Sequence, residues 1–299
     1  MTDRPADDIL AGLARAWPEL PLVGARLTGG GQNHAVVDTG ELIVRVVRYP
    51  TPANLARLAR EAALLQTLAN RLPAPVPVPV RLALDAHAGE PAYIAYRRLP
   101  GVPLSRQTYA MASAPVRDVA ARDLGRFLRA LHASAPRVAG LDLPRPSPVD
   151  TWGSLSDKVR RLVAPQLPTA VATAVAQHFD DFLASAADLP PDDALVHGDF
   201  GTSNLLWHPE TGRITAVLDF SEAHVGDRAV DLAALEASFG GDVLARAGYA
   251  LDPGARHRVA FYQGTFALQD AVFGLETGDE AAASAGLRGT LLRFGRTDA

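Results

Sequence analysis

The chain has 299 residues, of which 48% are hydrophobic and 21% charged, ordinary values for a globular protein that argue against intrinsic disorder. The lack of cysteine excludes disulfides and Cys-ligated zinc, and the formal net charge of −4 gives no basis for a nucleic-acid partner. The sequence has neither an apolar run of about 18 residues nor an apolar leader at Met1, so we expect a cytoplasmic protein without a membrane span. Only one residue of the chain is a lysine, Lys158, so any chemistry that needs a lysine must use that one or do without.

The N-terminal part of the chain alternates between strand-like and helix-like patterns. β-Branched runs bounded by turn residues predict strands, and apolar residues three and four apart predict helices. In chain order the expected elements are a helix over Asp7–Trp17, two strands within Arg26–Asp38, a strand over Glu41–Arg48, a helix over Ala53–Asn70, and a strand pair over Val80–Leu84 and Ala92–Arg98.

Beyond Gly101 the patterns are mostly helical. Helices are expected over Val116–Ala133, Thr169–Asp188, Arg228–Phe239 and Gly254–Leu275, interrupted by a hairpin of Asn204–Trp207 and Ile214–Leu218. We therefore predict an α+β chain with a small sheet-rich lobe over residues 1–98 and a larger, mostly helical lobe over residues 102–299. The hinge between them is expected at residues 96–101.

Polar residues gather on both sides of the predicted hairpin. Asp199 stands before its first strand, Asn204 begins that strand, and Asp219 follows the second strand. A hairpin would bring Asn204 back beside Asp219, and an amide oxygen with a carboxylate suits Mg²⁺, which prefers hard oxygen ligands. A loop carboxylate such as Asp199 can orient a hydroxyl and accept its proton. These residues predict phosphoryl transfer; the alternative is that Asp199 and Asn204 only cap turns.

The same residues carry a family resemblance. The pattern resembles the catalytic and metal-binding motifs of protein kinases: His197–Asp199 is followed by Asn204, and Asp219–Ser221 comes after a strand. In the first motif glycine replaces the kinase arginine, and in the second serine replaces the kinase glycine. In this form Leu195–Leu232 is similar to the aminoglycoside phosphotransferase family of antibiotic kinases. The run Leu218–Asp227 looks nearest to the macrolide 2′-phosphotransferases.

The resemblance implies a protein-kinase-like two-lobed fold and a role for each motif residue. Asp199 would be the catalytic residue at the acceptor hydroxyl, and Asn204 and Asp219 would hold Mg²⁺. Capping and bracing of the catalytic loop are the expected roles of the remaining polar residues of the motif, which are His197, Asp227 and Asp231.

A phosphate-binding cation is needed on the nucleotide side. Kinases use a strand lysine paired with a helix glutamate, and Lys158 lies too far along the chain for that position. The third strand offers Arg45 and the next helix offers Glu61. Val44 and Val46 share the opposite face of the strand, so we expect a partly buried Arg45, supported by Glu61, to bind nucleotide phosphates. A surface arginine on an edge strand is the alternative.

The remaining nucleotide contacts are expected at two loops. Gly30, Gly31 and Asn33 resemble the family's phosphate-covering loop, although an ordinary hairpin turn would have the same composition. At the hinge, the Arg97 carbonyl and the Leu99 N–H are expected to bind the purine edge. Tyr96 falls at the back of the base pocket, where the resemblance implies that a large aromatic side chain goes with use of GTP over ATP.

We therefore expect an enzyme that transfers the γ-phosphate of GTP, or of ATP, with Mg²⁺ to a hydroxyl of a macrolide antibiotic and so inactivates it. Charges are nearly balanced over residues 235–299, which also carry several aromatic side chains, and this favours an apolar acceptor over a polycationic aminoglycoside. Two alternatives stay open: a kinase of aminoglycosides or small amino alcohols, and a nucleotide-binding scaffold without turnover. We expect a monomer without nucleic-acid or membrane partners.

Overall fold

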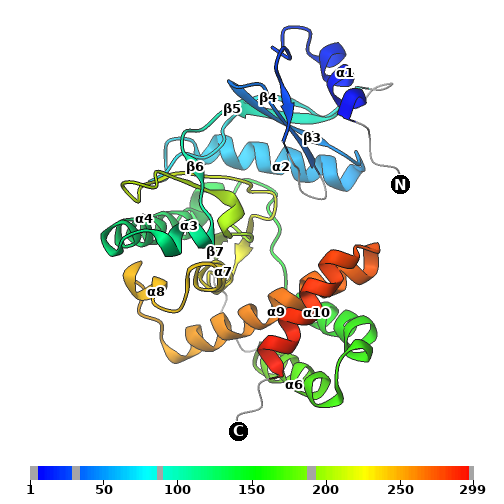
Figure 1. Cartoon of the computed structure of the whole chain (residues 1–299), viewed down its shortest axis with the longest axis vertical. Helices are drawn as coiled ribbons and strands as arrows, with labels where there is room; N and C mark the ends of the chain where they lie inside the picture. Colours follow the sequence, from blue (N-terminus) through cyan, green and yellow to red (C-terminus); the bar gives the residue numbers. More distant parts are fainter. Residues whose placement is uncertain (1–5, 29–33, 86–89, 187–192, 296–299) are drawn as a thin grey trace. The chain divides into compact units, whose positions relative to one another are not determined.

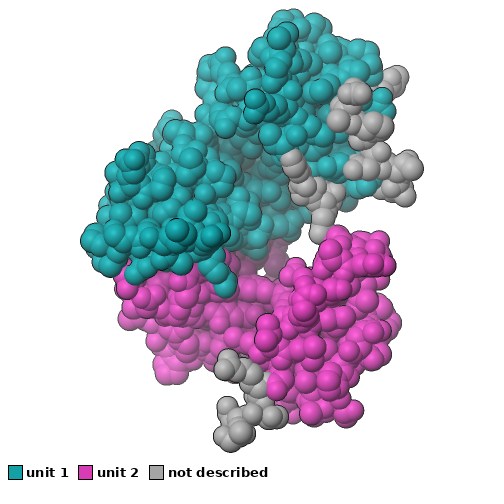
Figure 2. Space-filling model, viewed as in Figure 1, with its two compact units in different colours: residues 1–143, 197–223 teal, residues 144–196, 224–299 magenta. Residues whose placement is uncertain are grey.

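The computed structural model describes residues 6–28, 34–85, 90–186 and 193–295 (Figure 1). The chain forms two compact units, residues 1–143 with 197–223 and residues 144–196 with 224–299 (Figure 2). The expected hinge at residues 96–101 falls inside the first unit, so the predicted lobe boundary stays a prediction. No helix of the described ranges is long and apolar enough to cross a membrane.

A five-stranded antiparallel sheet forms one part of the first unit. Its strand order is β1-β2-β3-β5-β4. The strands are β1 (Arg26–Leu27), β2 (His34–Asp38), β3 (Leu42–Val47), β4 (Pro79–Ala83) and β5 (Tyr93–Arg97), and the accompanying helices are α1 (Ala6–Ala16) and α2 (Pro52–Leu68). The Thr51 side chain accepts a hydrogen bond from the Asn54 N–H at 3.3 Å, and Pro52 occupies the first turn, so α2 begins with a favourable cap.

The two faces of this sheet have different partners (Figure 1). Side chains alternate along a strand, so Val44 and Val46 of β3 face α1, where they pack with Ile9 and Leu13 in one apolar cluster. The opposite face therefore presents Arg45 toward α2. This alternation is why an arginine in the middle of a strand becomes buried instead of pointing to solvent.

A second, three-stranded sheet in the first unit carries the predicted hairpin. Strands β8 (Leu205–Trp207) and β9 (Ile214–Val217) pair as expected, and the two-residue strand β6 (Val102–Pro103), which was not predicted, pairs with β8. The helices of this part are α3 (Arg106–Met111) and α4 (Ala114–His132), followed by the short 3₁₀ turn η1 (Ala135–Val138). Asp123 of α4 accepts hydrogen bonds from the Arg213 side chain at 3.1 Å and the Ile214 N–H at 3.3 Å, which fixes the hairpin to the helix.

The second unit is mostly helical. Its helices are α5 (Pro148–Lys158), α6 (Thr169–Ala186), α7 (Ala229–Phe239), α8 (Val243–Arg246), α9 (Pro253–Thr277) and α10 (Glu280–Phe294), with η2 (Val159–Val163) and η3 (Ala164–Gln166) between α5 and α6. A small antiparallel ladder joins β7 (Ala194–Val196) to β10 (His224–Gly226). Helices α9 and α10 pack closely, since a Cβ atom added to Gly274 would lie 2.1 Å from the Ala283 nitrogen.

Candidate active site

Arg45 is the centre of a buried charged cluster. Its Nη1 donates to Glu61 Oε1 at 2.6 Å, and its Nη2 donates to Asp219 Oδ1 at 3.2 Å. Only 6% of the Arg45 side chain and 1% of the Glu61 side chain are exposed. Glu61 Oε1 also accepts the Phe220 N–H at 3.2 Å, so this carboxylate binds both the arginine and the backbone next to Asp219. Three residues expected at the nucleotide and the metal are therefore in direct contact.

Burial and charge act against each other in this cluster. Burial on its own would lower the pKa of Arg45, but Glu61 and Asp219 outweigh it and raise that pKa, so the guanidinium stays charged. Burial raises the pKa of Glu61 in spite of the Arg45 charge. Burial would also raise the pKa of Asp219, but Arg45 and the hydrogen bonds from Ser221 hold it below its usual value. Asp219 is thus kept as a carboxylate.

The backbone at Asp219 is unusual. Its φ of 56° lies in the left-handed region, where non-glycine residues are uncommon but aspartate is tolerated better than most. The Ser221 N–H donates to Asp219 Oδ1 at 3.3 Å, and the preceding Leu218 N–H donates to the Asn204 carbonyl at 2.8 Å. The β8–β9 hairpin thus returns the chain to Asn204, and the turn at Asp219 brings its carboxylate to Arg45.

Asn204 and Asp199 are held by one amide group. Asn204 Nδ2 donates to both the carbonyl and Oδ2 of Asp199, at 2.9 and 2.8 Å. Because both partners are acceptors, the Asn204 Oδ1 atom must face away from them and keeps its lone pairs for another ligand. Asp199 itself is exposed, so its second carboxylate oxygen is accessible to a hydroxyl group.

The donor set fits Mg²⁺. Asn204 Oδ1 and the Asp219 carboxylate oxygens are hard oxygen donors, and the side-chain hydrogen bonds from Asn204 to Asp199 both use its Nδ2 atom. Within the described ranges no group of three or more His, Cys, Asp or Glu side chains is arranged to hold a metal. Magnesium is commonly bound through one or two carboxylates together with substrate phosphates and water, so a site of two protein ligands is sufficient.

His197 connects the two sides of the site. Its Nδ1 accepts the Asp199 N–H at 3.3 Å, and its Nε2 donates to the Leu218 carbonyl at 2.9 Å. The ring is fully buried and packs 4.7 Å from the Phe220 ring. One ring nitrogen binds the Asp199 loop and the other binds the end of the hairpin at Leu218, an arrangement compatible with the predicted bracing role.

Gly198 explains one departure from the protein-kinase motif. Its φ is +84°, and a Cβ atom at this position would lie 2.4 Å from the Glu222 carbonyl oxygen. Both observations require glycine where protein kinases carry arginine. The loop that carries Asp199 therefore packs directly against the segment that follows Asp219.

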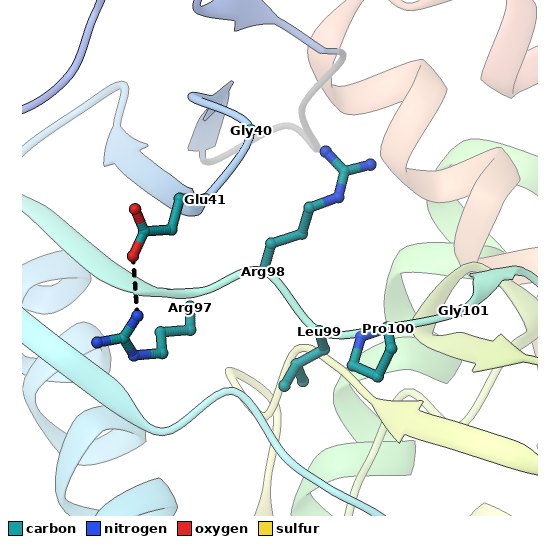
Figure 3. Close-up of a pocket in the computed structure, with 7 residues that line it drawn as sticks. All are labelled: Gly40, Glu41, Arg97, Arg98, Leu99, Pro100 and Gly101. Atoms are coloured by element: carbon teal, nitrogen blue, oxygen red, sulfur yellow. Dashed lines mark hydrogen bonds and ion pairs between the residues drawn. The ribbon is translucent and has the colours of Figure 1, made fainter.

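The residues of the expected hinge directly follow the pairing of β5 with β3. The Arg98 N–H donates to the Glu41 carbonyl at 2.8 Å, so its backbone faces β3. Successive residues of a strand direct their backbone groups to opposite sides, which turns the Arg97 carbonyl and the Leu99 N–H away from β3. A pocket of about 400 Å³ lies beside this segment, lined by Gly40, Glu41 and the residues from Arg97 to Gly101 (Figure 3). Arg97 Nη1 donates to Glu41 Oε1 at 2.9 Å, and the Arg98 side chain points away from Glu41 (Figure 3).

Tyr96 lies on the same sheet face as Arg45. It pairs with Ile43 of β3 in the register that pairs Arg45 with Ile94, and only 7% of it is exposed. Burial raises the pKa of Tyr96 to about 12, with Arg45 acting in the opposite direction, so its hydroxyl stays protonated. The expected place of Tyr96 at the back of a base pocket stays a prediction.

The other predicted residues lie elsewhere. Asp227 Oδ1 accepts the Ala229 N–H at 3.0 Å, and its Oδ2 accepts Arg258 Nε and the Tyr262 hydroxyl, each at 2.8 Å, so it links the start of α7 to α9. Asp231, in the first turn of α7, is fully buried. Both belong to the second unit. Three residues of the expected phosphate loop, Gly30, Gly31 and Asn33, lie outside the described residues.

Sequence reasoning overlooked three neighbours of this site. His34 Nδ1 is 3.5 Å from Arg45 Nη2, and burial, with the Arg45 charge second, lowers the pKa of His34 to about 4. Arg57 of α2 donates to Glu222 Oε1 at 2.6 Å. A helical count could have found Arg57, which precedes Glu61 by one turn, but no local pattern connects it to a residue so far along the chain.

Comparison with known proteins agrees with this chemistry. A model of the phosphotransferase enzyme family matches residues 25–262. The viomycin phosphotransferase of Streptomyces vinaceus is 33% identical over 275 residues, which cover 89% of this chain and 93% of that protein.

Solved structures show the fold. The GDP complex of wild-type aminoglycoside 2′-phosphotransferase-IIIa has a TM-score of 0.83, 20% identity, and coverage of 95% of this chain and 97% of that one. The macrolide 2′-phosphotransferase MphH from Brachybacterium faecium, as apoenzyme, has a TM-score of 0.69, 27% identity, and coverage of 98% and 99%. The predicted protein-kinase-like α+β fold is confirmed by these likenesses.

Proposed function

The chain belongs to the phosphotransferase enzyme family, and from this we propose that it transfers the γ-phosphate of a nucleoside triphosphate, preferably GTP, to a hydroxyl group of a macrolide antibiotic. The observation that carries the proposal is the contact of Arg45 with both Glu61 and Asp219. Arg45, Asp219 and the hydrogen-bonded pair Asp199–Asn204 belong to one unit, which supports their roles as phosphate-binding cation, metal ligand, proton acceptor and second metal ligand.

Asp199 orients the acceptor hydroxyl and takes its proton. The acceptor oxygen then forms a bond to the γ-phosphorus, the bond from that phosphorus to the bridging oxygen breaks, and the nucleoside diphosphate leaves with the bonding electrons. Asn204 restrains the Asp199 carboxylate through Nδ2, so only one of its oxygen atoms is committed before the hydroxyl arrives. Arg45 remains charged through the reaction and binds phosphate oxygens with its N–H groups.

Asn204 Oδ1 and the Asp219 carboxylate would hold Mg²⁺. When bound, the ion neutralises charge on the nucleotide phosphates. Ser221 and Arg45 keep Asp219 ionised and oriented through its Oδ1 atom.

The buried Tyr96 supports GTP as the donor. A tyrosine is bulky at the back of a base pocket, and the aromatic ring would hinder the adenine pose. We expect GTP to give the higher kcat/KM, and Tyr96→Ala to raise kcat/KM for ATP. A wild-type enzyme with the higher kcat/KM for ATP would contradict the steric argument.

Two observations support a macrolide acceptor. The macrolide kinase from B. faecium is 27% identical over nearly the whole chain. In addition, acidic residues of the second unit already have partners: Glu236 binds Arg256 and Gln263, each at 2.8 Å, and Glu276 binds Lys158 at 3.0 Å. Such paired carboxylates are a poor match for a polycationic aminoglycoside.

Viomycin is the second candidate acceptor, favoured by the 33% identity of the S. vinaceus enzyme. Incubation of the protein with Mg²⁺, GTP or ATP, and a panel of macrolides, viomycin and aminoglycosides separates the candidates, with product mass as the readout. A phosphorylated macrolide is the expected product, and a phosphorylated viomycin alone would replace the macrolide proposal. Nucleotide-induced thermal stabilisation without any product would favour the non-catalytic scaffold. The expected monomeric state is a separate prediction, which light scattering in solution tests.

A further inference from the structure

Helix α2 contacts the segment after β9 at two points. Glu61 accepts the Phe220 N–H at 3.2 Å, and Arg57 donates to Glu222 Oε1 at 2.6 Å. Residues four apart on a helix lie on one face, so Arg57 and Glu61 present a pair of opposite charges to this short segment. The two contacts bind both ends of the stretch from Phe220 to Glu222, which begins directly after the expected metal ligand Asp219.

Glu222 also contacts the catalytic loop. The position of a Cβ atom on Gly198 lies 2.4 Å from the Glu222 carbonyl oxygen, so the two backbones are in close contact. Gly198 immediately precedes Asp199. A shift of Glu222 would therefore be transmitted to the loop that carries Asp199 and, three residues back, to Asp219.

We propose that Arg57 and Glu222 are a positioning pair, which keeps the Asp219 turn at a fixed distance from the Asp199 loop. This inference rests on the proposed function, and neither Arg57 nor Glu222 would touch the reacting atoms. The side chains are 34% and 54% exposed, so the pair contributes little to global stability. Its effect should therefore appear in turnover and in binding of the magnesium–nucleotide complex.

Charge reversal tests the pair. Arg57→Glu and Glu222→Arg should each lower kcat by about five- to twentyfold and weaken the affinity for a fluorescent GDP analogue in the presence of Mg²⁺ by about threefold or more. The double variant R57E/E222R restores the attraction with the charges exchanged. The kcat should then return to within about twofold of wild type and the affinity to within about 1.5-fold, and the melting temperature should stay nearly constant throughout.

A matched control comes from the second unit. Arg160 donates to Asp180 at the same 2.6 Å, and these side chains are 49% and 57% exposed. Arg160→Glu should leave kcat and nucleotide affinity unchanged. The proposal is overturned if Arg57→Glu and Glu222→Arg behave like Arg160→Glu, or if the double variant shows no recovery.

The affinity for the GDP analogue is measured without an antibiotic, so it tests the positioning pair separately from the proposed function. If the wild-type protein phosphorylates nothing in the acceptor panel, the proposed function fails. The pattern of loss and recovery in nucleotide affinity then decides on the positioning pair by itself. Recovery in the double variant supports it, and equal loss in all three variants contradicts it.

Discussion

Replacing Arg45 by methionine should destabilise the protein strongly. The substitution keeps most of the side-chain volume but leaves the Glu61 carboxylate buried without its charged partner, and Glu61 Oε2 already makes no hydrogen bond with any described residue. Removing one partner of a buried ion pair typically costs about 3–5 kcal/mol, because the remaining charge stays desolvated. We expect a loss of this size in the free energy of unfolding, measured by urea denaturation at pH 7.

The deficit should depend on pH. Burial already raises the pKa of Glu61 in the wild-type protein, and loss of the Arg45 charge raises it further. A folded-state pKa above the unfolded value gives stability that is present at low pH and lost as the pH rises through the folded pKa. Arg45→Met should therefore be closer to wild type at pH 5 than at pH 8.

Arg160→Met is the control for this experiment. Arg160 makes an ion pair of the same 2.6 Å length but on the surface, so its loss should cost at most about 1 kcal/mol at either pH. Equal costs for the Arg45 and Arg160 variants, or a deficit for Arg45→Met that does not grow with pH, would refute the account of a buried, charge-compensating arginine. In the same preparations, Arg45→Met should also lose most of its affinity for nucleotide.

Three further variants test other parts of the structure. Gly198→Ala should cost about 2–4 kcal/mol and most of the activity, because φ is +84° and the Cβ would overlap a carbonyl oxygen, whereas Gly140→Ala, with open space at its Cβ, should be neutral in melting and turnover assays. The pKa of His34 is lowered to about 4, so the folded protein loses stability as the pH falls from 6.5 to 4. Replacing His34 by glutamine should reduce this loss in the free energy of unfolding by at most about 3 kcal/mol, measured by urea denaturation at a series of pH values. The same pH dependence in both proteins would contradict the argument. Asp123→Ala leaves the buried Ile214 N–H without its acceptor and should lower the free energy of unfolding by about 1–3 kcal/mol in urea denaturation. A change near zero would contradict this expectation.

The parts of the fold with strong local periodicity were predictable. Alternation along β3 placed Val44 on one face and Arg45 on the other, and the structure has this arrangement. The turn residues between Trp207 and Ile214 predicted the β8–β9 hairpin, which fixed the proximity of Asn204 to the chain near Asp219.

Other elements depend on contacts that no local pattern reveals. Strand β6 has two residues and exists only because it pairs with β8. Helix α10 is rich in alanine and glycine, and its packing depends on Gly286, where an added Cβ would lie 2.2 Å from the Ala271 nitrogen of α9. The Arg57–Glu222 contact spans 165 residues of sequence, so only the tertiary fold shows it.

An arginine at the proposed phosphate position changes how the protein can be labelled. Amine-reactive reagents, including nucleotide probes that acylate lysine, have no target side chain at Arg45. The chain's one lysine, Lys158, lies in the second unit, is 40% exposed and pairs with Glu276. Apart from the N-terminal amine, a single side chain is then available for attaching a dye or a surface tether, and the Arg45 cluster stays chemically unmodified.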